Sequence, residues 1–243
     1  HYCHQSSWNM IEKPWNGFAA RPSYMDLFDG KDVRGAGVGY GADTLGTMCT
    51  QQFAWFLGPV CDKDGNVLKD ENGDLAIVKK EVEETLSEAT WNDGARFCKY
   101  EVDKNKKYDW AENDYVLMRY ADVLWMKEEA ILRGGQGTSG FNSPDFQKMK
   151  ARAFAYEENP AAAYAAAYPD VLTLDKICDE RGREFSWECI RRRDLIRFDK
   201  YDKIEFVTAK EPFRRWFPIP FSVIEKAKRD ENGNPIWTQN EGY

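Results

Sequence analysis

Three glutamates spaced four residues apart form the pattern in this sequence that most suggests chemistry. Glu180, Glu184 and Glu188 would share one face of a helix, because four residues make slightly more than one helical turn. Two carboxylates can act as the acid and the base of glycoside hydrolysis. Arg181 and Arg183 lie between these glutamates, and guanidinium groups hold carboxylates in ion-pair networks. The pattern therefore favours a structural network over a catalytic pair.

Nucleophilic catalysis has little support in the sequence. The chain contains two histidines, His1 and His4, so a Ser or Cys triad with a histidine from the interior of the chain is not available. The motifs GxSxG, GxGxxG and GxxxxGK[ST] do not occur. The glycines of residues 34–41, RGAGVGYG, do not link an apolar strand to a helix, and they predict a flexible loop. We therefore expect a protein that is not an enzyme and that uses no cofactor.

Two short segments imitate metal sites without completing them. His1, Cys3 and His4 lack a distant ligand that would close a coordination shell. Residues 62–66, DKDGN, begin like a calcium loop, but the terminal glutamate and the flanking helices are missing. The six cysteines contain no CxxC pair, which argues against a zinc ribbon. The sequence predicts no metal site.

Composition narrows the class of partner. The 243 residues carry a formal net charge of −7, so the chain lacks the overall basic character of nucleic-acid binders, and no nucleic-acid partner is expected. No run of eighteen apolar residues occurs, which excludes a membrane-spanning helix on sequence grounds. Aromatic residues make up 14% of the chain and include nine tryptophans. Exposed indole rings suit the C–H face of a sugar, while the indole N–H can bond a hydroxyl.

The first part of the chain predicts irregular structure. Residues 1–47 show no sustained helical or strand period and are rich in glycine and proline. One short helix is expected at 23–29, where Ser23 would cap its N-terminus. A long irregular stretch within a compact protein is usually functional or disordered, and the aromatic residues of this one argue against disorder.

Residues 48–103 predict a small region of hairpins and short strands. Apolar and polar residues alternate there, and the dipeptides Asp64-Gly65 and Asn72-Gly73 are typical of tight turns. Leu75 and Ile77 alternate with polar or smaller neighbours and are expected to form the buried face of one strand.

Helices are expected over most of residues 113–243. The first would be capped by Asn113 or Asp114 and closed by Gly134-Gly135, because its apolar residues recur three or four apart. Further helices are predicted from their caps and apolar spacing at 144–153, after Thr173, at 189–198 and at 221–227.

Candidate binding residues are sought among aromatics in irregular chain, since aromatics in periodic elements usually belong to the core. The tryptophans and tyrosine of the first segment have side chains beside them that can hydrogen-bond sugar hydroxyls. The predicted ligand-binding residues are Trp8, Asn9, Trp15, Asn16, Arg21 and Tyr24. An alternative is that Trp15 and Tyr24 pack the loop onto the helices. The tryptophans predicted to be core are Trp110, Trp125, Trp187, Trp216 and Trp237.

Five segments, in order, resemble the SusD/RagB family of glycan-binding lipoproteins of Bacteroidetes. They are WNDGARFCKYE at 91–101, NDYVLMRYADVLWMKEEAI at 113–131, KMKARAF at 148–154, ICDERGREFSWECIRRRDLIRF at 177–198, and the tail at 216–243. The tail carries the elements FPIP, NP, QN and GY. Cys189 stands where the family prefers Gly, Arg192-Arg193 replace an aromatic pair, and Glu241 replaces the last Pro.

The resemblance implies a fold and a domain plan. The fold would be mainly α, with long irregular loops and a small β-hairpin region, as the C-terminal portion of one SusD-like domain beside tetratricopeptide-like helices. Residues 1–47, 48–103 and 113–243 would be its loop, hairpin and helical regions, and the N-terminal half would be absent from this chain. The tail is expected to pack back on the helices.

The resemblance also implies a function. A SusD-like protein binds an oligosaccharide at the cell surface without catalysis and passes it to a SusC-like, TonB-dependent outer-membrane transporter. It would be lipid-anchored in the outer membrane through the absent N-terminal part. The alternative is a helical scaffold for protein–protein interaction without sugar binding.

Overall fold

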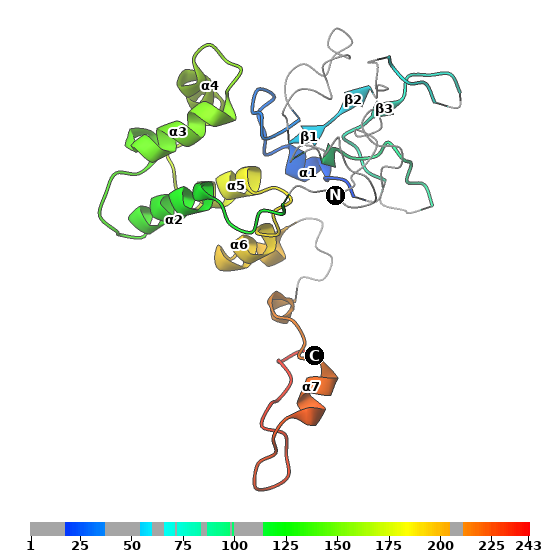
Figure 1. The fold of residues 1–243 in the computed structure, drawn as a ribbon, viewed down its shortest axis with the longest axis vertical. Coiled ribbons are helices and arrows are strands. Elements are labelled where there is room, and N and C mark those ends of the chain that lie inside the picture. The colour runs from blue at the N-terminus through cyan, green and yellow to red at the C-terminus, as the bar shows by residue number, and fades with distance from the viewer. Residues whose placement is uncertain are drawn as a thin grey trace. The chain divides into compact units, whose positions relative to one another are not determined.

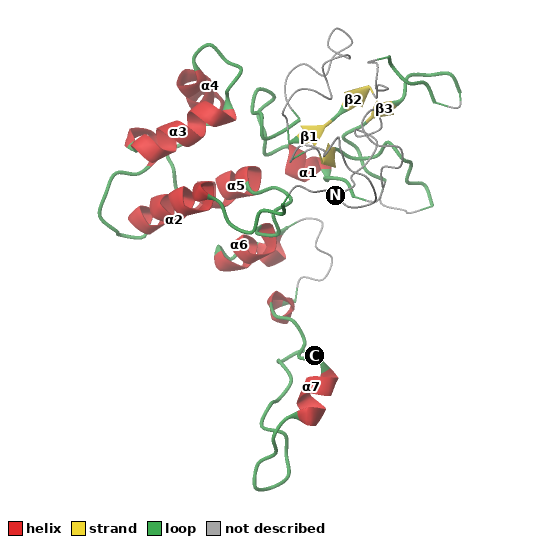
Figure 2. Ribbon diagram, in the orientation of Figure 1, coloured by secondary structure: helices red, strands yellow, loops and turns green. Residues whose placement is uncertain are grey.

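The computed structural model describes residues 18–36, 54–59, 66–70, 72–83, 87–97, 99, 114–204 and 211–243. Within these ranges the fold is mainly α with short antiparallel strands, which confirms the predicted fold class (Figure 1, Figure 2). The chain forms two compact units, His1–Cys189 and Ile190–Tyr243. The predicted plan of one SusD-like domain with three regions stays a prediction, as does the tetratricopeptide-like detail.

The strands of the first unit form two small antiparallel ladders. β1 (Trp55–Phe56) pairs with β4 (Arg96–Phe97), and β2 (Gly58–Pro59) pairs with β3 (Ile77–Val78). The turn at 70–74 matches the predicted Asn72-Gly73 position, where Gly73 takes a positive φ of 85° that favours glycine. The other predicted turn dipeptide lies outside the described residues.

The predicted face of strand β3 is wrong by one residue. Ala76 and Val78 are the buried side chains, while Leu75 and Ile77 are exposed. Val78 lies opposite Gly58 and packs in a cluster with Phe56. Alternation fixes only the period of a strand, so a shift by one position reverses which residues face the core.

The described residues of the first unit form five α-helices. They are α1 (Pro22–Met25), α2 (Tyr120–Leu132), α3 (Pro144–Ala153), α4 (Pro160–Ala167) and α5 (Leu174–Glu184). Side chains cap three of them, because Ser143, Asn159 and Thr173 accept hydrogen bonds from the backbone N–H three residues on. The predicted helices at 144–153 and after Thr173 are confirmed, whereas α4 was not predicted.

Two predicted helix starts are wrong. Ser23 does not cap α1, which begins at Pro22 with Arg21 at the N-cap. α2 begins at Tyr120 rather than after Asp114, because Arg119 has an extended backbone with φ −145° and ψ 160°. Its side chain bonds carboxylates of the ion network described below, and this tertiary contact overrides the apolar period of residues 116–124.

An aromatic core joins the helices of the first unit. α3 packs against α4, and α2 packs against α5. Trp125 is buried, as predicted, with its ring edge-on to Phe146 at 5.6 Å between centroids. Phe146, Met149 and Ala153 form the buried face of α3 that the spacing predicts.

The second unit contains α6 (Arg191–Arg197), η4 (Tyr201–Lys203), η5 (Pro212–Arg215) and α7 (Phe221–Lys226). α6 and α7 confirm the helices predicted at 189–198 and 221–227, with shorter bounds. The tail, residues 216–243, includes α7 and ends at Tyr243.

Hydrogen bonds between the two ends of the tail explain its sequence elements. The Gln239 amide accepts from the N–H of Ile219 at 2.7 Å and donates to its carbonyl at 2.9 Å, as a neighbouring strand would. Asn240 Nδ2 donates to the carbonyl of Phe217, and the Tyr243 hydroxyl donates to that of Trp216. The FPIP element therefore binds the QN element directly, and the GY element binds Trp216, the residue before FPIP.

Arg192, a residue of α6, binds the start of the tail and the residues just before it within the second unit. Its Nη2 donates to the carbonyls of Arg214 and Arg215, and its guanidinium lies 4.2 Å from the ring centroid of Phe217. A cation over an aromatic face is attracted by the ring quadrupole. Arg192 thus holds the start of the tail.

Three of the tryptophans predicted to be core are exposed. Trp216 is 63% exposed and Trp237 is 55% exposed, because so short a unit holds its tail with side chain–backbone hydrogen bonds rather than a second apolar layer. Trp187 is also exposed, at 37%. Trp110 lies outside the described residues.

Candidate functional site

The structure describes two of the six predicted ligand-binding residues. Arg21 is the N-cap residue of α1, and its carbonyl accepts from the N–H groups of Tyr24 and Met25. Trp8, Asn9, Trp15 and Asn16 lie outside the described residues.

Tyr24 holds α1 on α5. Its hydroxyl donates to the Gly182 carbonyl at 2.6 Å, and its half-buried ring lies edge-on to Phe28 and Trp55. These contacts match the packing role that was the alternative for this residue. Sugar contact by Tyr24 stays a prediction.

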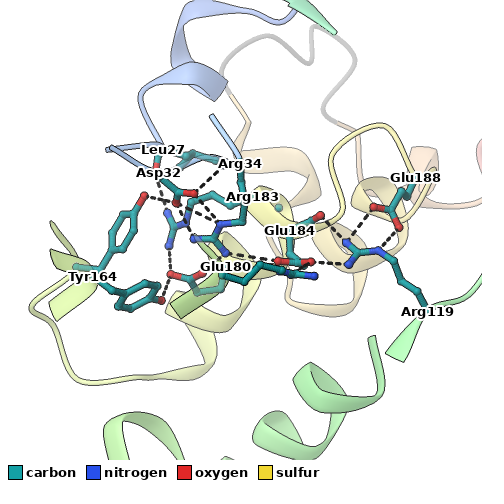
Figure 3. Close-up of polar contacts among 12 residues, drawn as sticks. Leu27, Asp32, Arg34, Arg119, Tyr164, Glu180, Arg183, Glu184 and Glu188 are labelled. Carbon is teal, nitrogen blue, oxygen red and sulfur yellow. Dashed lines mark hydrogen bonds and ion pairs between the residues drawn. The ribbon is translucent and has the colours of Figure 1, made fainter. Parts of the chain in front are cut away.

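A buried ion network begins just after α1. Arg34 binds Asp32 through Nε at 2.9 Å and Nη2 at 2.7 Å, and its Nη1 lies 2.9 Å from Glu180 of α5 (Figure 3). Asp32 is fully buried, and Arg34 and Glu180 are nearly so. The fork of Arg34 therefore ties the N-terminal segment to α5. The prediction of a flexible loop at 34–41 is wrong for Arg34.

Two tyrosines also bond this half of the network, one within α4 and one at its C-cap. Tyr164 donates its hydroxyl to Glu180, and Tyr168 donates to Asp32 at 2.8 Å while accepting from the N–H of Asp29. Burial and the nearby Glu180 carboxylate raise the pKa of Tyr164, so its hydroxyl stays protonated and remains a donor.

Arg183 adds a second guanidinium to Glu180. Its Nη2 donates to Glu180 at 2.5 Å, and its Nη1 donates to the Leu27 carbonyl at 2.8 Å (Figure 3). Burial alone would raise the pKa of Glu180, but the charges of Arg34 and Arg183 outweigh it and lower the pKa.

The other half of the network surrounds Glu184 and Glu188. Arg119 bonds Glu184 through Nη1 at 2.5 Å and Glu188 through Nε at 2.8 Å (Figure 3). Arg152 pairs with Glu184, and Lys99 pairs with Glu188. Burial raises the pKa of Glu184, but the fields of Arg152, Arg119 and Arg34 prevail and lower it to about 2.

This geometry confirms a structural network at the three glutamates. A general acid near neutral pH needs a carboxyl whose pKa is raised, whereas Glu180 and Glu184 are held ionised by arginines. The network therefore holds residues 27–34 on α5. Sequence reasoning missed Asp32, Arg34 and the tyrosine pair. The four-residue spacing of Tyr164 and Tyr168 within AAAYAAAY was an available signal for one helix face.

Exposed aromatic rings lie near this anchored segment. Phe18 is 62% exposed, and its ring is edge-on to Trp187 at 5.4 Å between centroids. Trp187 also stacks on Phe97, with centroids 4.9 Å apart. Phe18 follows the predicted residues Trp15 and Asn16 closely in sequence. The described surface therefore offers aromatic rings, one of which follows the predicted binding residues in sequence.

The backbone at position 189 favours glycine. Cys189 has a φ of 59°, in the left-handed region where a Cβ is unfavourable. We expect Cys189→Gly to raise the free energy of unfolding by about 0.5–1 kcal/mol, measured by urea denaturation. Cys189→Ala keeps the Cβ and should bring no gain. An equal gain from alanine would show that the thiol, and not the backbone, is the cause.

No cluster of three or more His, Cys, Asp or Glu side chains in the described ranges is placed to hold a metal ion. Of the two metal-like sequences, only Asn66 lies within those ranges. None of the helices that the structure describes has the length and apolar character needed to cross a bilayer.

Comparison with known proteins agrees with the resemblance. The SusD family pattern matches residues 3–212. The starch-binding protein SusD of Bacteroides thetaiotaomicron is 28% identical over 142 residues, which cover 54% of this chain and 22% of that relative. The chain thus aligns with less than a quarter of the relative's length. The match over residues 3–212 covers most of the sequence, and the chain belongs to the SusD family.

Proposed function

We propose that this chain is part of a cell-surface protein that binds an oligosaccharide without catalysis. Membership of the SusD family is the observation that carries the proposal. The exposed rings of Phe18 and Trp187 support it, since aromatic faces suit sugar rings. The relative that is named for starch binding makes starch oligosaccharides the first ligands to test.

The proposed setting is nutrient uptake at the outer membrane. The intact protein would be lipid-anchored on the cell-surface side and would pass its glycan to a SusC-like, TonB-dependent transporter. A rigid binding surface suits such transfer, because binding then costs little ordering of the protein. The buried network that ties residues 27–34 to α5 supports this proposal, since it fixes the chain that follows the predicted binding residues in sequence.

The proposal predicts a loss of affinity when Trp8 and Trp15 are removed together. In the intact protein, Trp8→Ala with Trp15→Ala should raise the Kd for a bound oligosaccharide about tenfold or more, since buried aromatic anchors dominate such interfaces. Isothermal titration calorimetry with starch oligosaccharides, followed by other glycans, measures this.

A matched control removes two tryptophans that lie far from this segment in sequence. Trp216→Ala with Trp237→Ala takes the same number of indoles from the second unit, where both are exposed, and should leave the Kd unchanged. An unchanged Kd in the Trp8 and Trp15 variant would contradict the predicted site. Release of shortened sugars from any glycan would contradict the non-catalytic role.

The second candidate function is a helical scaffold for another protein. It is favoured by a run of exposed apolar side chains at and before α2, in which Leu117 is 80% and Met118 is 85% exposed. Contiguous exposed apolar surface often marks an interaction site. The calorimetric experiment separates the two functions, because a scaffold would give no heat of binding with any glycan.

A further inference from the structure

A small pocket lies where the end of α4 meets the beginning of α5. Its volume is about 160 Å³. Phe141, Tyr168 and Leu172 give it apolar walls, and Asp170, Lys176 and Asp179 line it with charged groups. A cavity of about 150 Å³ holds one benzene-sized ring, so this pocket accommodates a single six-membered ring. The predicted site residues do not line it.

The aromatic wall is fixed before any ligand arrives. The Tyr168 hydroxyl is bonded to Asp32, and the Arg183 guanidinium lies 4.2 Å from the Tyr168 ring centroid. The ring also lies edge-on to Tyr164, at 5.1 Å between centroids. A side chain held from several directions loses little entropy when a ligand stacks on it.

The polar groups of the pocket suit a neutral compound with several hydroxyls. Asp170 and Lys176 form an ion pair at 2.6 Å, and both side chains are about half exposed or more. An ammonium offers three donors and a carboxylate about four acceptor positions, so this pair has capacity for further hydrogen bonds. With Asp179, Glu180 and Arg183, the lining holds three carboxylates and two cations. This mixture favours neither an anion nor a cation.

We propose that this pocket binds a single neutral sugar ring, as a site separate from the predicted segment at residues 8–24. The choice of sugar as the ligand class rests on the proposed function. One ring face lies against Tyr168, and the hydroxyls bond Asp170, Lys176 and Asp179. So small a contact predicts a Kd on the order of millimolar.

The test is an NMR titration of the intact protein with methyl α-glucoside, followed by methyl glycosides of other sugars. We expect saturable amide shifts at Phe141 and residues 168–179. Ala167 lines the pocket without bonding through its side chain, so Ala167→Trp should fill it and weaken binding about tenfold or more. Ala166→Trp lies one position away on the exposed side of α4 and should bind like wild type.

Two further variants replace Ala167→Trp if it does not fold and separate this inference from the proposed function. If Ala167→Trp does not fold, Lys176→Met at an exposed position replaces it and should weaken binding several-fold. Binding should persist in the Trp8→Ala, Trp15→Ala variant, which separates this inference from the proposed function. The absence of saturable shifts with every glycoside, or shifts confined to residues outside the pocket, would overturn the inference. Equal binding by the filled and unfilled pockets would do the same.

Discussion

Replacing Arg34 with methionine should lower the free energy of unfolding by about 3–5 kcal/mol, because it takes the cation from buried Asp32 and one of two guanidinium groups from buried Glu180. Asp32 is fully buried, and Glu180 is 2% exposed. Each would keep other hydrogen bonds, but the guanidinium that neutralises both would be gone. Removal of one partner from a buried ion pair costs far more than the pair itself contributes. Urea denaturation followed by circular dichroism measures the loss.

The control is an arginine in an ordinary surface pair. Arg214 bonds Glu211 three residues earlier, and both side chains are exposed, at 42% and 53%. Arg214→Met should therefore change stability by about 0.5 kcal/mol or less. Arg34→Lys tests the guanidinium geometry, since an ammonium keeps the charge but cannot bond both carboxylates in the same way. This variant should lose less free energy of unfolding than Arg34→Met. If Arg34→Met costs no more than Arg214→Met, the network does not hold the N-terminal segment.

The network also shows what could be predicted from sequence. Glu180, Glu184 and Glu188 were placed in one ion-pair network because the signal is local, with arginines interleaved along a single helix. Helix caps such as Ser143 and Thr173 were found for the same reason. These features depend on residues a few positions apart, where the spacing fixes the geometry.

Features that depend on distant residues were not predicted. Arg34 lies 146 positions from its partner Glu180, and no spacing rule connects them. The start of α2 was misplaced because Arg119 bonds Glu184 and Glu188, which lie on a segment far along the chain. In both cases a tertiary ion pair overrides a local pattern. For the candidate site, the sequence supplied residue types, but the pocket beside Tyr168 depends on how α4 and α5 pack.

Acid should weaken the same network, in part through protonation of Glu184. Its pKa falls from the ordinary 4.5 to about 2 in the folded protein, since the fields of Arg152, Arg119 and Arg34 outweigh the cost of burial. A carboxyl with a lowered folded pKa gives stability that is complete above its unfolded pKa and is lost as the pH falls toward its folded pKa. The free energy of unfolding should therefore drop by about 3 kcal/mol between roughly pH 5 and pH 2 from this residue.

The pKa of Glu180 is also lowered, so it adds a loss of the same sign over the acid range. Glu184→Gln separates the two residues, because an amide cannot titrate. The variant should have a lower free energy of unfolding near neutral pH. Between roughly pH 5 and pH 2 this free energy should fall less than in the wild type, because the contribution of Glu184 is absent. Glu158→Gln, at an exposed position before α4, should keep the slope of the wild type. Urea denaturation at a series of pH values gives each slope. Parallel slopes for wild type and Glu184→Gln would mean that the arginines do not hold Glu184 ionised, and the stability of the network would then rest on Arg34 and Glu180 alone.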